Sequence, residues 1–245
     1  MVSSQLSVVF EQRTTDKGQL TKDYEMSVSA DSIKELLHSD NLGDRLRAVN
    51  QIRELEPQIG LELVQIAIGD SSARVRYSAV SQMDTLGTQD LPLSLTILRG
   101  LLHDPEPDVQ AAAADCLGAL KLHDAFEDLQ KLYQETPEWL VQFSIIATLG
   151  ELGDPRAWEL LTQALASDNG LIQTAAISSF GELGDPKAVP LLVPYCTNPD
   201  WQVRYRVVQA LIRLGSDEAK SILATLVNDE VEAISKEAKA GLQLV

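Results

Sequence analysis

The sequence is poor in cysteine, in aromatic residues and in basic charge. Two cysteines, Cys116 and Cys196, are too few for a disulfide framework, which favours a reducing compartment. Lys and Arg number 20 against 36 Asp and Glu, and the formal charge of −16 disfavours binding to a phosphate backbone. No apolar run approaches the roughly 18 residues of a spanning helix, and residues 1–17 lack the features of a signal peptide. We expect a soluble cytoplasmic protein that binds no nucleic acid and is not inserted in a membrane.

Standard catalytic and metal-binding motifs are also missing. The sequence contains no phosphate-binding G-x-x-x-x-G-K-[ST], no G-x-G-x-x-G, no H-E-x-x-H and no C-x-x-C. None of the histidines is followed by glutamate, so the repeated His-Glu pairs of one class of iron-binding repeat enzymes are absent: His38, His103 and His123. We therefore expect no metal site and no tightly bound cofactor.

The sequence does have an internal repeat. The segment Leu-Gly-Asp-Pro-Arg-Ala at 152–157 returns as Leu-Gly-Asp-Pro-Lys-Ala at 183–188, 31 residues later. This period gives seven apolar anchor residues, spaced by 29, 34, 32, 31, 31 and 31 residues: Leu46, Val75, Val109, Val141, Ile172, Val203 and Ile234. A period of this length is typical of solenoid proteins.

The residues around each anchor predict two helices per unit. Five residues before the anchors stand residues suited to cap a helix N-terminus: Asn41, Asp70, Asp104, Thr136, Ser167, Asn198 and Asp229. In three units a proline follows and is predicted at the first helical position: Pro105, Pro137 and Pro199. Twelve residues after four of the anchors stand glycines suited to a left-handed C-cap: Gly87, Gly153, Gly184 and Gly215. In this pattern, a first helix spans for example 154–165 and a second helix 198–214.

One helical hairpin cannot bury its apolar stripe alone, so neighbouring hairpins must stack. The sequence therefore predicts an all-α protein, an α-solenoid of about seven HEAT-like helical hairpins forming a right-handed superhelix over residues 30–245. Its second helices are expected to line the concave face. Residues 1–29 lie outside the repeat and are predicted to form a flexible N-terminal extension, within which Met26 is a candidate natural start.

A row of polar residues directly follows the anchors: Arg47, Arg76, Gln110, Gln142, Gln173, Arg204 and Ser235. One interpretation is a row of hydrogen-bond donors on the concave face that binds carboxylates. The other is that Asp–Arg and Asn–Arg pairs tie neighbouring repeats together, and for Arg47 and Arg76 this second interpretation is favoured. Arg206 lies outside the pattern and is the freer candidate for binding.

Large aromatic residues recur at equivalent repeat positions. Trp139 and Trp201 stand two residues before their anchors, and Phe143 and Tyr205 stand two residues after theirs. Aromatic side chains beside arginine are typical of a protein interface or a site for a flat ligand. Rings wedged between repeats would give the same pattern, and the sequence leaves both interpretations open.

The unit as a whole resembles the HEAT-like repeat of the phycobilisome lyase family of cyanobacteria. The resemblance covers about residues 27–245 and rests on Leu-Gly-Asp-Pro-Arg/Lys-Ala followed by Asp/Asn-Pro-Asp/Glu-x-x-Val-Arg/Gln. The segments at 104–110, 138–143 and 200–206 resemble the NblB branch, the phycobilisome-degradation proteins, more than the heterodimeric phycocyanin lyases.

This resemblance implies a protein that binds phycobiliproteins (phycocyanin, allophycocyanin) or their phycocyanobilin, and that promotes phycobilisome disassembly at the thylakoid surface. It implies either a bilin lyase acting in the detaching direction or a non-catalytic adaptor, and the oligomeric state is left open. Bilin or partner binding is assigned to Trp139, Gln142, Phe143, Gln173, Trp201, Arg204, Tyr205 and Arg206. The candidates for proton transfer are Glu138, Asp200 and Tyr205.

Overall fold

The computed structural model describes residues 29–244, without the side chain of Leu244, and the regular elements in this range are all helical. The predicted extension, apart from Ser29, and the candidate start Met26 lie outside the described residues. Seven helical hairpins follow one another, and we number them repeats 1 to 7. In chain order they are α1 (Ala30–Leu37) with α2 (Leu42–Gln51), α3 (Pro57–Ile68) with α4 (Ala73–Val80) and α5 (Met83–Leu86), α6 (Leu91–Leu101) with α7 (Pro107–Ala119), α8 (Phe126–Glu135) with α9 (Trp139–Leu152), α10 (Trp158–Leu165) with α11 (Gly170–Leu183), α12 (Val189–Leu192) with α13 (Trp201–Leu214), and α14 (Asp217–Leu226) with α15 (Glu232–Leu244).

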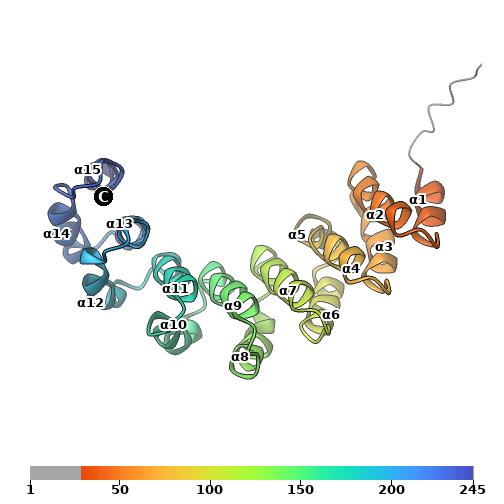
Figure 1. The fold of residues 1–245 in the computed structure, drawn as a ribbon, viewed down its shortest axis with the longest axis horizontal. Coiled ribbons are helices and arrows are strands. Elements are labelled where there is room, and N and C mark those ends of the chain that lie inside the picture. The colour runs from red at the N-terminus through yellow and green to blue at the C-terminus, as the bar shows by residue number, and fades with distance from the viewer. Residues whose placement is uncertain (1–28, 245) are drawn as a thin grey trace, which may run out of the picture.

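The hairpins stack into a curved array (Figure 1). The second helices α2, α4, α7, α9, α11, α13 and α15 lie along the inner side of the curve, and each packs against the next. The first helices form the outer layer. The structure thus confirms an all-α solenoid with a concave face built from second helices.

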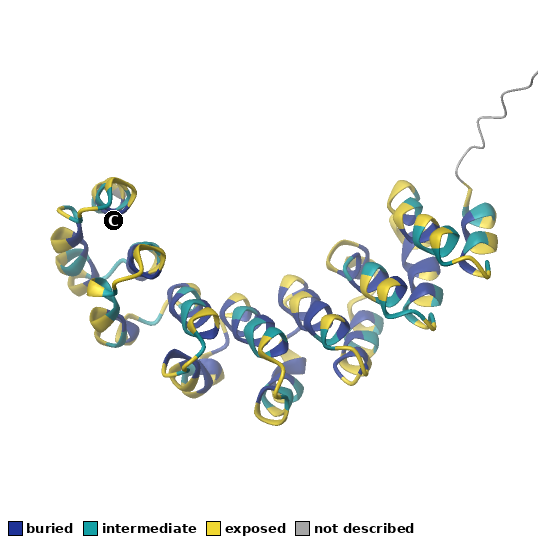
Figure 2. Cartoon of the chain, viewed as in Figure 1, coloured by how far each residue is buried: buried dark blue, intermediate teal, exposed yellow. Residues whose placement is uncertain are grey.

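The hydrophobic core lies between the two layers and between successive repeats (Figure 2). Six of the seven predicted anchors belong to it, each no more than 8% exposed: Val75, Val109, Val141, Ile172, Val203 and Ile234. The seventh, Leu46, was misplaced, because it is only half-buried. Ala48 and Val49 are fully buried and stand 31 residues before the buried Ala79 and Val80. The same shift of 31 residues from the anchor Val75 leads to Asp44, which therefore holds the anchor position of repeat 1.

The second helices begin later than predicted in repeats 2 to 7. The predicted capping residues precede the helix and use a side-chain oxygen to accept a hydrogen bond from the backbone N–H two residues on, as Asn198 does from Asp200 at 2.9 Å. The same bond is made by Asp70, Asp104, Thr136, Ser167 and Asp229, and in repeat 1 by Ser39. These turns compete with helix for the local backbone donors. Pro105, Pro137 and Pro199 therefore lie in the turn and not at the first helical position.

Three of the four predicted glycine C-caps adopt the left-handed conformation: Gly153, Gly184 and Gly215, with φ of 67°, 73° and 61°. Gly87 does not, since its φ is −63° and it continues into a 3₁₀ turn. In repeat 3 the left-handed position is filled by Lys121, with φ of 53°. The backbone geometry of the repeat is thus kept there without a glycine.

Buried side chains join the second helices of repeats 1 to 5. Gln82, Cys116, Thr148 and Ser179 each stand seven residues after an anchor and each donate to a backbone carbonyl of the preceding second helix. The donor–acceptor distances are 2.8, 3.2, 2.8 and 2.8 Å. Repeat 6 has Ala210 at this position, so this series of bonds ends between α11 and α13.

Candidate binding groove on the concave face

The polar row that follows the anchors is turned toward the junctions between repeats. Arg204 donates from Nε and Nη2 to the carboxylate of Asp229 at 2.8 and 3.0 Å, and from Nη1 to the carbonyl of Asn198 at 2.8 Å. Only 7% of its side chain is exposed. The prediction that Arg204 binds a ligand is wrong, because its guanidinium is buried and held by the next repeat.

In other repeats this position also forms structural bonds, through arginines that reach the next repeat and glutamines that bond within their own. Arg76 pairs with Asp104 at 2.7 Å, and Arg45 pairs with Asp70 at 2.7 Å. Gln142 donates to the carbonyl of Thr136 in the turn before its own helix at 3.0 Å, and Gln173 donates to the carbonyl of Leu165 at the end of α10 at 3.1 Å, so both amides bond within their own repeat. Arg47 is not part of the row, because the corrected register of repeat 1 gives that place to Arg45.

The electrostatics of these junctions stabilise the charged forms. The hydrogen bond from Arg204 lowers the pKa of Asp229 below its usual value, although burial opposes this. Burial alone would raise the pKa of Asp104, but hydrogen bonds from Arg76 and from the backbone N–H of Glu106 bring it below the usual value. Both carboxylates are therefore structural anions and not proton carriers at neutral pH.

The concave face is hollowed into a groove of about 1120 Å³ that runs across α9, α11, α13 and α15. Its apolar lining comes from Phe143, Leu171, Trp201 and Tyr205, and its floor includes small residues such as Ala147 and Ser178. Trp201 is 46% exposed and Leu171 is 54% exposed, so both present apolar surface to whatever enters the groove.

The groove brings together half of the residues predicted for the site: Phe143, Asp200, Trp201, Tyr205 and Arg206. Trp139 is 47% exposed but does not line the groove. Glu138 lines a separate hollow of about 310 Å³ beside Pro105 and Pro137. The two aromatic residues at matching repeat positions, Trp139 and Trp201, thus lie at different places on the surface, with α11 between their helices.

Sequence reasoning missed several lining residues, above all Leu171 and Lys236. Lys236 stands two residues after its anchor, as Phe143 and Tyr205 do, and Leu171 stands one residue before its anchor. These positions face the groove in repeat after repeat. The missing step was to follow each position through every repeat instead of following one type of residue.

Charges of both signs line the groove. Arg206 is exposed and its Nη1 donates to Oε1 of Gln209 at 3.1 Å. Within residues 29–244 neither Arg206 nor Lys236 forms an ion pair, so both cations are available to a ligand. Asp200 accepts from the backbone N–H of Gln202 at 2.8 Å, and Glu182 and Glu237 also line the groove. The groove can therefore bind carboxylates and N–H donors beside a flat apolar surface.

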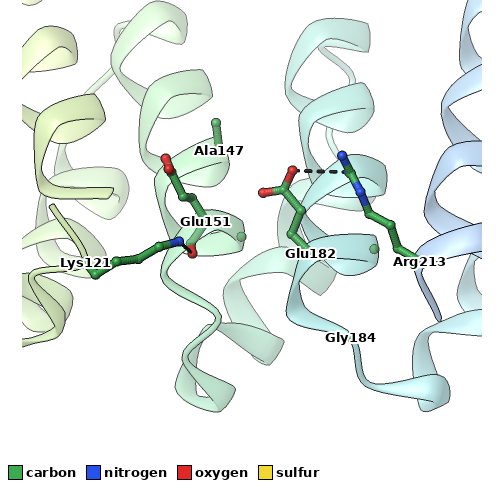
Figure 3. Close-up of a pocket in the computed structure, with 8 residues that line it drawn as sticks. Lys121, Ala147, Glu151, Glu182, Gly184 and Arg213 are labelled. Carbon is green, nitrogen blue, oxygen red and sulfur yellow. Dashed lines mark hydrogen bonds and ion pairs between the residues drawn. The ribbon is translucent and has the colours of Figure 1, made fainter. Parts of the chain in front are cut away.

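A second hollow of about 780 Å³ adjoins the groove and shares Ala147 and Glu182 with it. Figure 3 shows its charged residues in two pairs, Lys121 beside Glu151 and Glu182 beside Arg213. Arg213 lies 3.2 Å from Glu182, and the Nζ of Lys121 donates to the backbone carbonyl of Glu151. The concave surface thus changes from largely apolar near the N-terminal ends of α9, α11 and α13 to charged at their C-terminal ends.

Neither cysteine is placed for covalent chemistry in the groove. Cys116 is buried in the core, and burial raises the pKa of its thiol to about 12. Burial also raises the pKa of Cys196 to about 11, and neither residue lines the groove. The described part of the chain contains no cluster of three or more metal-binding side chains. None of its helices is long and apolar enough to cross a membrane.

Comparison with known proteins gives a family and several similar folds. A family model described as HEAT repeats matches residues 94–180 and 159–243. A chain of the CpcE–CpcF complex of phycocyanin lyase from Nostoc sp. PCC7120 is 21% identical with a TM-score of 0.61, over 96% of this chain and 92% of that one. The Escherichia coli protein YibA is 15% identical with a TM-score of 0.64, over 88% of this chain and 81% of YibA. An engineered protein is 18% identical with a TM-score of 0.61, over 87% of this chain and 67% of the engineered one. No curated protein matches the chain in sequence.

Proposed function

The chain belongs to the HEAT-repeat family, and we propose that it is a phycobilisome-directed member of it. In this proposal the groove binds a phycobiliprotein, phycocyanin or allophycocyanin, together with the phycocyanobilin that it carries. Binding promotes phycobilisome disassembly and keeps the protein at phycobilisomes on the thylakoid surface. The similarity of its fold to a phycocyanin lyase chain supports this choice of partner.

The observation that carries the proposal is the composition of the groove. Phycocyanobilin is a flat open-chain tetrapyrrole with two propionates and several pyrrole N–H groups. Trp201, Phe143 and Leu171 offer apolar surface to the rings. Arg206 and Lys236 suit the propionates, and the carboxylates of the groove suit the N–H groups. The volume of about 1120 Å³ slightly exceeds the roughly 300–1,000 Å³ of common ligand pockets, as a large ligand or a ligand still attached to protein requires.

The proposal includes a chemical step, detachment of the bilin by elimination. A base removes a proton from the carbon next to the thioether carbon, a C=C bond forms, and the sulfur leaves and takes up a proton. We assign the base to Asp200 and the proton donor to Tyr205, since both line the groove. The raised pKa values of Cys116 and Cys196 argue against a relay of the bilin through a thiolate of this chain.

The test mixes the purified protein with holo-phycocyanin. Complex formation is measured by size exclusion, and bilin that is still covalently attached is measured by zinc-enhanced fluorescence after denaturing electrophoresis. We expect a complex and a loss of subunit-bound bilin. A complex with all bilin retained would make the protein an adaptor without chemistry, and the absence of both signals would refute the proposed function.

Variants tie the result to the groove. The double variant Arg206→Glu/Lys236→Glu should lose complex formation, because it replaces both free cations with anions. The matched control Lys131→Glu/Lys187→Glu makes the same charge change at two exposed residues that do not line the groove and should bind as the wild type does. Tyr205→Phe should keep binding and lose detachment.

A further inference from the structure

A second exposed patch of cations and an aromatic ring lies on the concave face at the other end of the molecule. It consists of Arg47 on α2 and Arg74 and Tyr77 on α4, and we call it the N-terminal patch. The exposed fraction of Tyr77 is 48%, and 62% of the Arg47 side chain is exposed. Burial therefore does not explain why these large side chains stand there.

The repeat register relates the patch to the groove. Tyr77 stands two residues after its anchor, as do the groove residues Phe143, Thr174, Tyr205 and Lys236. Arg74 stands one residue before its anchor, as do Leu171, Gln202 and Ala233. With the first anchor position at Asp44, Arg47 is equivalent to Arg206. The patch is therefore made from the positions that line the groove in repeats 4 to 7.

Both cations of the patch are available for binding. Arg74 forms no ion pair within the described residues 29–244. Arg47 is 3.3 Å from Asp44, a neighbour on its own helix, in a contact that solvent screens. Asp108 on α7 holds the position of Arg74 in the next repeat and forms no ion pair with it. The patch is thus a local cationic surface on a chain whose formal net charge is −16.

The curvature of the solenoid sets the two surfaces at opposite ends of one concave face. Figure 1 shows α2 and α4 at one end of the inner side and α13 and α15 at the other, with α7, α9 and α11 between them. At the positions of Tyr77 and Arg47, repeat 3 carries Ala111 and Ala112. A large partner that lies along the concave face can therefore touch both ends.

We infer that the N-terminal patch is a second docking surface, which binds an acidic protein surface of the partner that occupies the groove. Arginine recognises carboxylates through paired N–H donors, and an exposed tyrosine adds apolar area and a hydroxyl. Two contacts on one partner raise the overall affinity, because the second forms within an already bound complex. The docking surface itself stands on the patch, and only the identity of the partner rests on the proposed function.

The first measurement uses a probe that does not depend on the phycobilisome. A fluorescent peptide of about twenty residues that alternates glutamate and tyrosine is titrated by anisotropy at low salt, where exposed charges are least screened. The variants are Arg47→Glu/Arg74→Glu, Tyr77→Ala and the control Lys131→Glu/Lys187→Glu, each checked for unchanged melting. We expect the arginine variant to weaken binding by about tenfold or more and the control to leave it unchanged.

The second measurement repeats the titration with holo-phycocyanin. Loss of affinity in the N-terminal patch variant and in the groove variant Arg206→Glu/Lys236→Glu, each separately, would support one partner that touches both ends. Peptide binding that is sensitive to the patch, with no binding of phycocyanin by the wild type, would refute the proposed function and leave the docking surface standing.

Three outcomes would overturn the inference. They are no binding of the peptide by the wild type, peptide binding that survives Arg47→Glu/Arg74→Glu, and tighter binding of single-stranded DNA of the same length than of the peptide at the same patch. The last outcome would assign the surface to a polyphosphate and not to a protein.

Discussion

At the scale of single residues, Arg204 and Arg206 show how two neighbouring arginines acquire different tasks. Successive helical residues point about 100° apart, so a step of two residues turns the side chain to another face of α13. Arg204 is directed to the junction with repeat 7 and Arg206 to the groove. The residue type alone gives no sign of this difference.

The pairing partner of Arg204 could have been found in the sequence. Arg45, Arg76 and Arg204 precede repeats whose turn starts with aspartate: Asp70, Asp104 and Asp229. Gln110, Gln142 and Gln173 precede repeats whose turn starts with a neutral residue: Thr136, Ser167 and Asn198. Arginine follows the anchor where the turn of the next repeat starts with aspartate, and glutamine follows it where that turn starts with a neutral residue. This covariation between repeats is the pattern of a structural ion pair.

We predict that Arg204→Ala destabilises the protein by about 3 kcal/mol, because it leaves the carboxylate of Asp229 without its main partner in a mostly buried place. Arg206→Ala, two residues away and exposed, should change stability by less than about 0.5 kcal/mol. Urea unfolding followed by circular dichroism measures both. Equal effects would contradict the assignment of Arg204 to the junction.

At the scale of the helix, the sequence predicted the type and order of elements well and their starts less well. Hydrophobic periodicity placed seven hairpins, because each unit must bury the same face against its neighbours. The starts were placed too early, because Asn198 and its equivalents favour both a helix cap and a turn that precedes the helix. Leu46 was chosen as an anchor since it is apolar, although the spacing of 29 residues was already irregular.

The groove was only half predictable at this scale. Aromatic residues point to it, which is why Phe143, Trp201 and Tyr205 were found. Leu171 and Lys236 have side chains that are common on any helix, and only their repeat position sets them apart. Exposure of Trp139 outside the groove depends on the packing of α9 against its neighbours, which no local pattern contains.

The series of buried bonds between second helices gives a matched pair of predictions. Ser179→Ala removes the bond to the carbonyl of Ile146 and should destabilise by about 1 kcal/mol. Ala210→Ser supplies a donor where the series ends, and the repeat register sets it opposite the carbonyl of Ile177 on α11. We expect a gain of about 1 kcal/mol from this change.

The control for this pair is Ser178→Ala. The hydroxyl of Ser178 bonds within its own helix to Thr174 at 3.3 Å, so its loss should have little effect on the junction. Thermal melting ranks the three variants, and hydrogen exchange of the α11 and α13 amides localises the change. A destabilising Ala210→Ser would mean that α11 and α13 pack too closely at this point to admit the hydroxyl.

At the scale of the whole molecule, the junctions between repeats differ in what holds them. A mostly buried Arg–Asp ion pair joins repeats 1 and 2, repeats 2 and 3, and repeats 6 and 7. Repeats 3, 4 and 5 are joined by buried hydroxyl donors to backbone carbonyls, which do not titrate in acid, and the Arg99–Asp128 ion pair between repeats 3 and 4 is more exposed than the pairs at the ends. Repeats 5 and 6 are joined by the hydroxyl of Tyr195, which donates to the carbonyl of Leu165 at 2.9 Å, and by the more exposed ion pair of Arg213 with Glu182. Stability in a solenoid is close to a sum over such junctions, so conditions that weaken one type of junction act locally.

At acid pH the terminal repeats should therefore unfold before the central ones. The folded-state pKa values of Asp104 and Asp229 are lowered, so the stability that they contribute is complete above the unfolded-state value of about 3.9 and is lost as the pH falls through the folded-state values. Asp154, in the middle, also has a lowered pKa, but its partner Arg156 is half exposed and the contact is weaker. At about pH 3, pepsin should cut first in repeats 1, 2 and 7 and spare residues 91–214 the longest.

Arg204→Ala should free repeat 7 at neutral pH and abolish the acid dependence at that end alone. Uniform cleavage along the chain would show that the array unfolds as one cooperative unit, and that its junctions do not act separately.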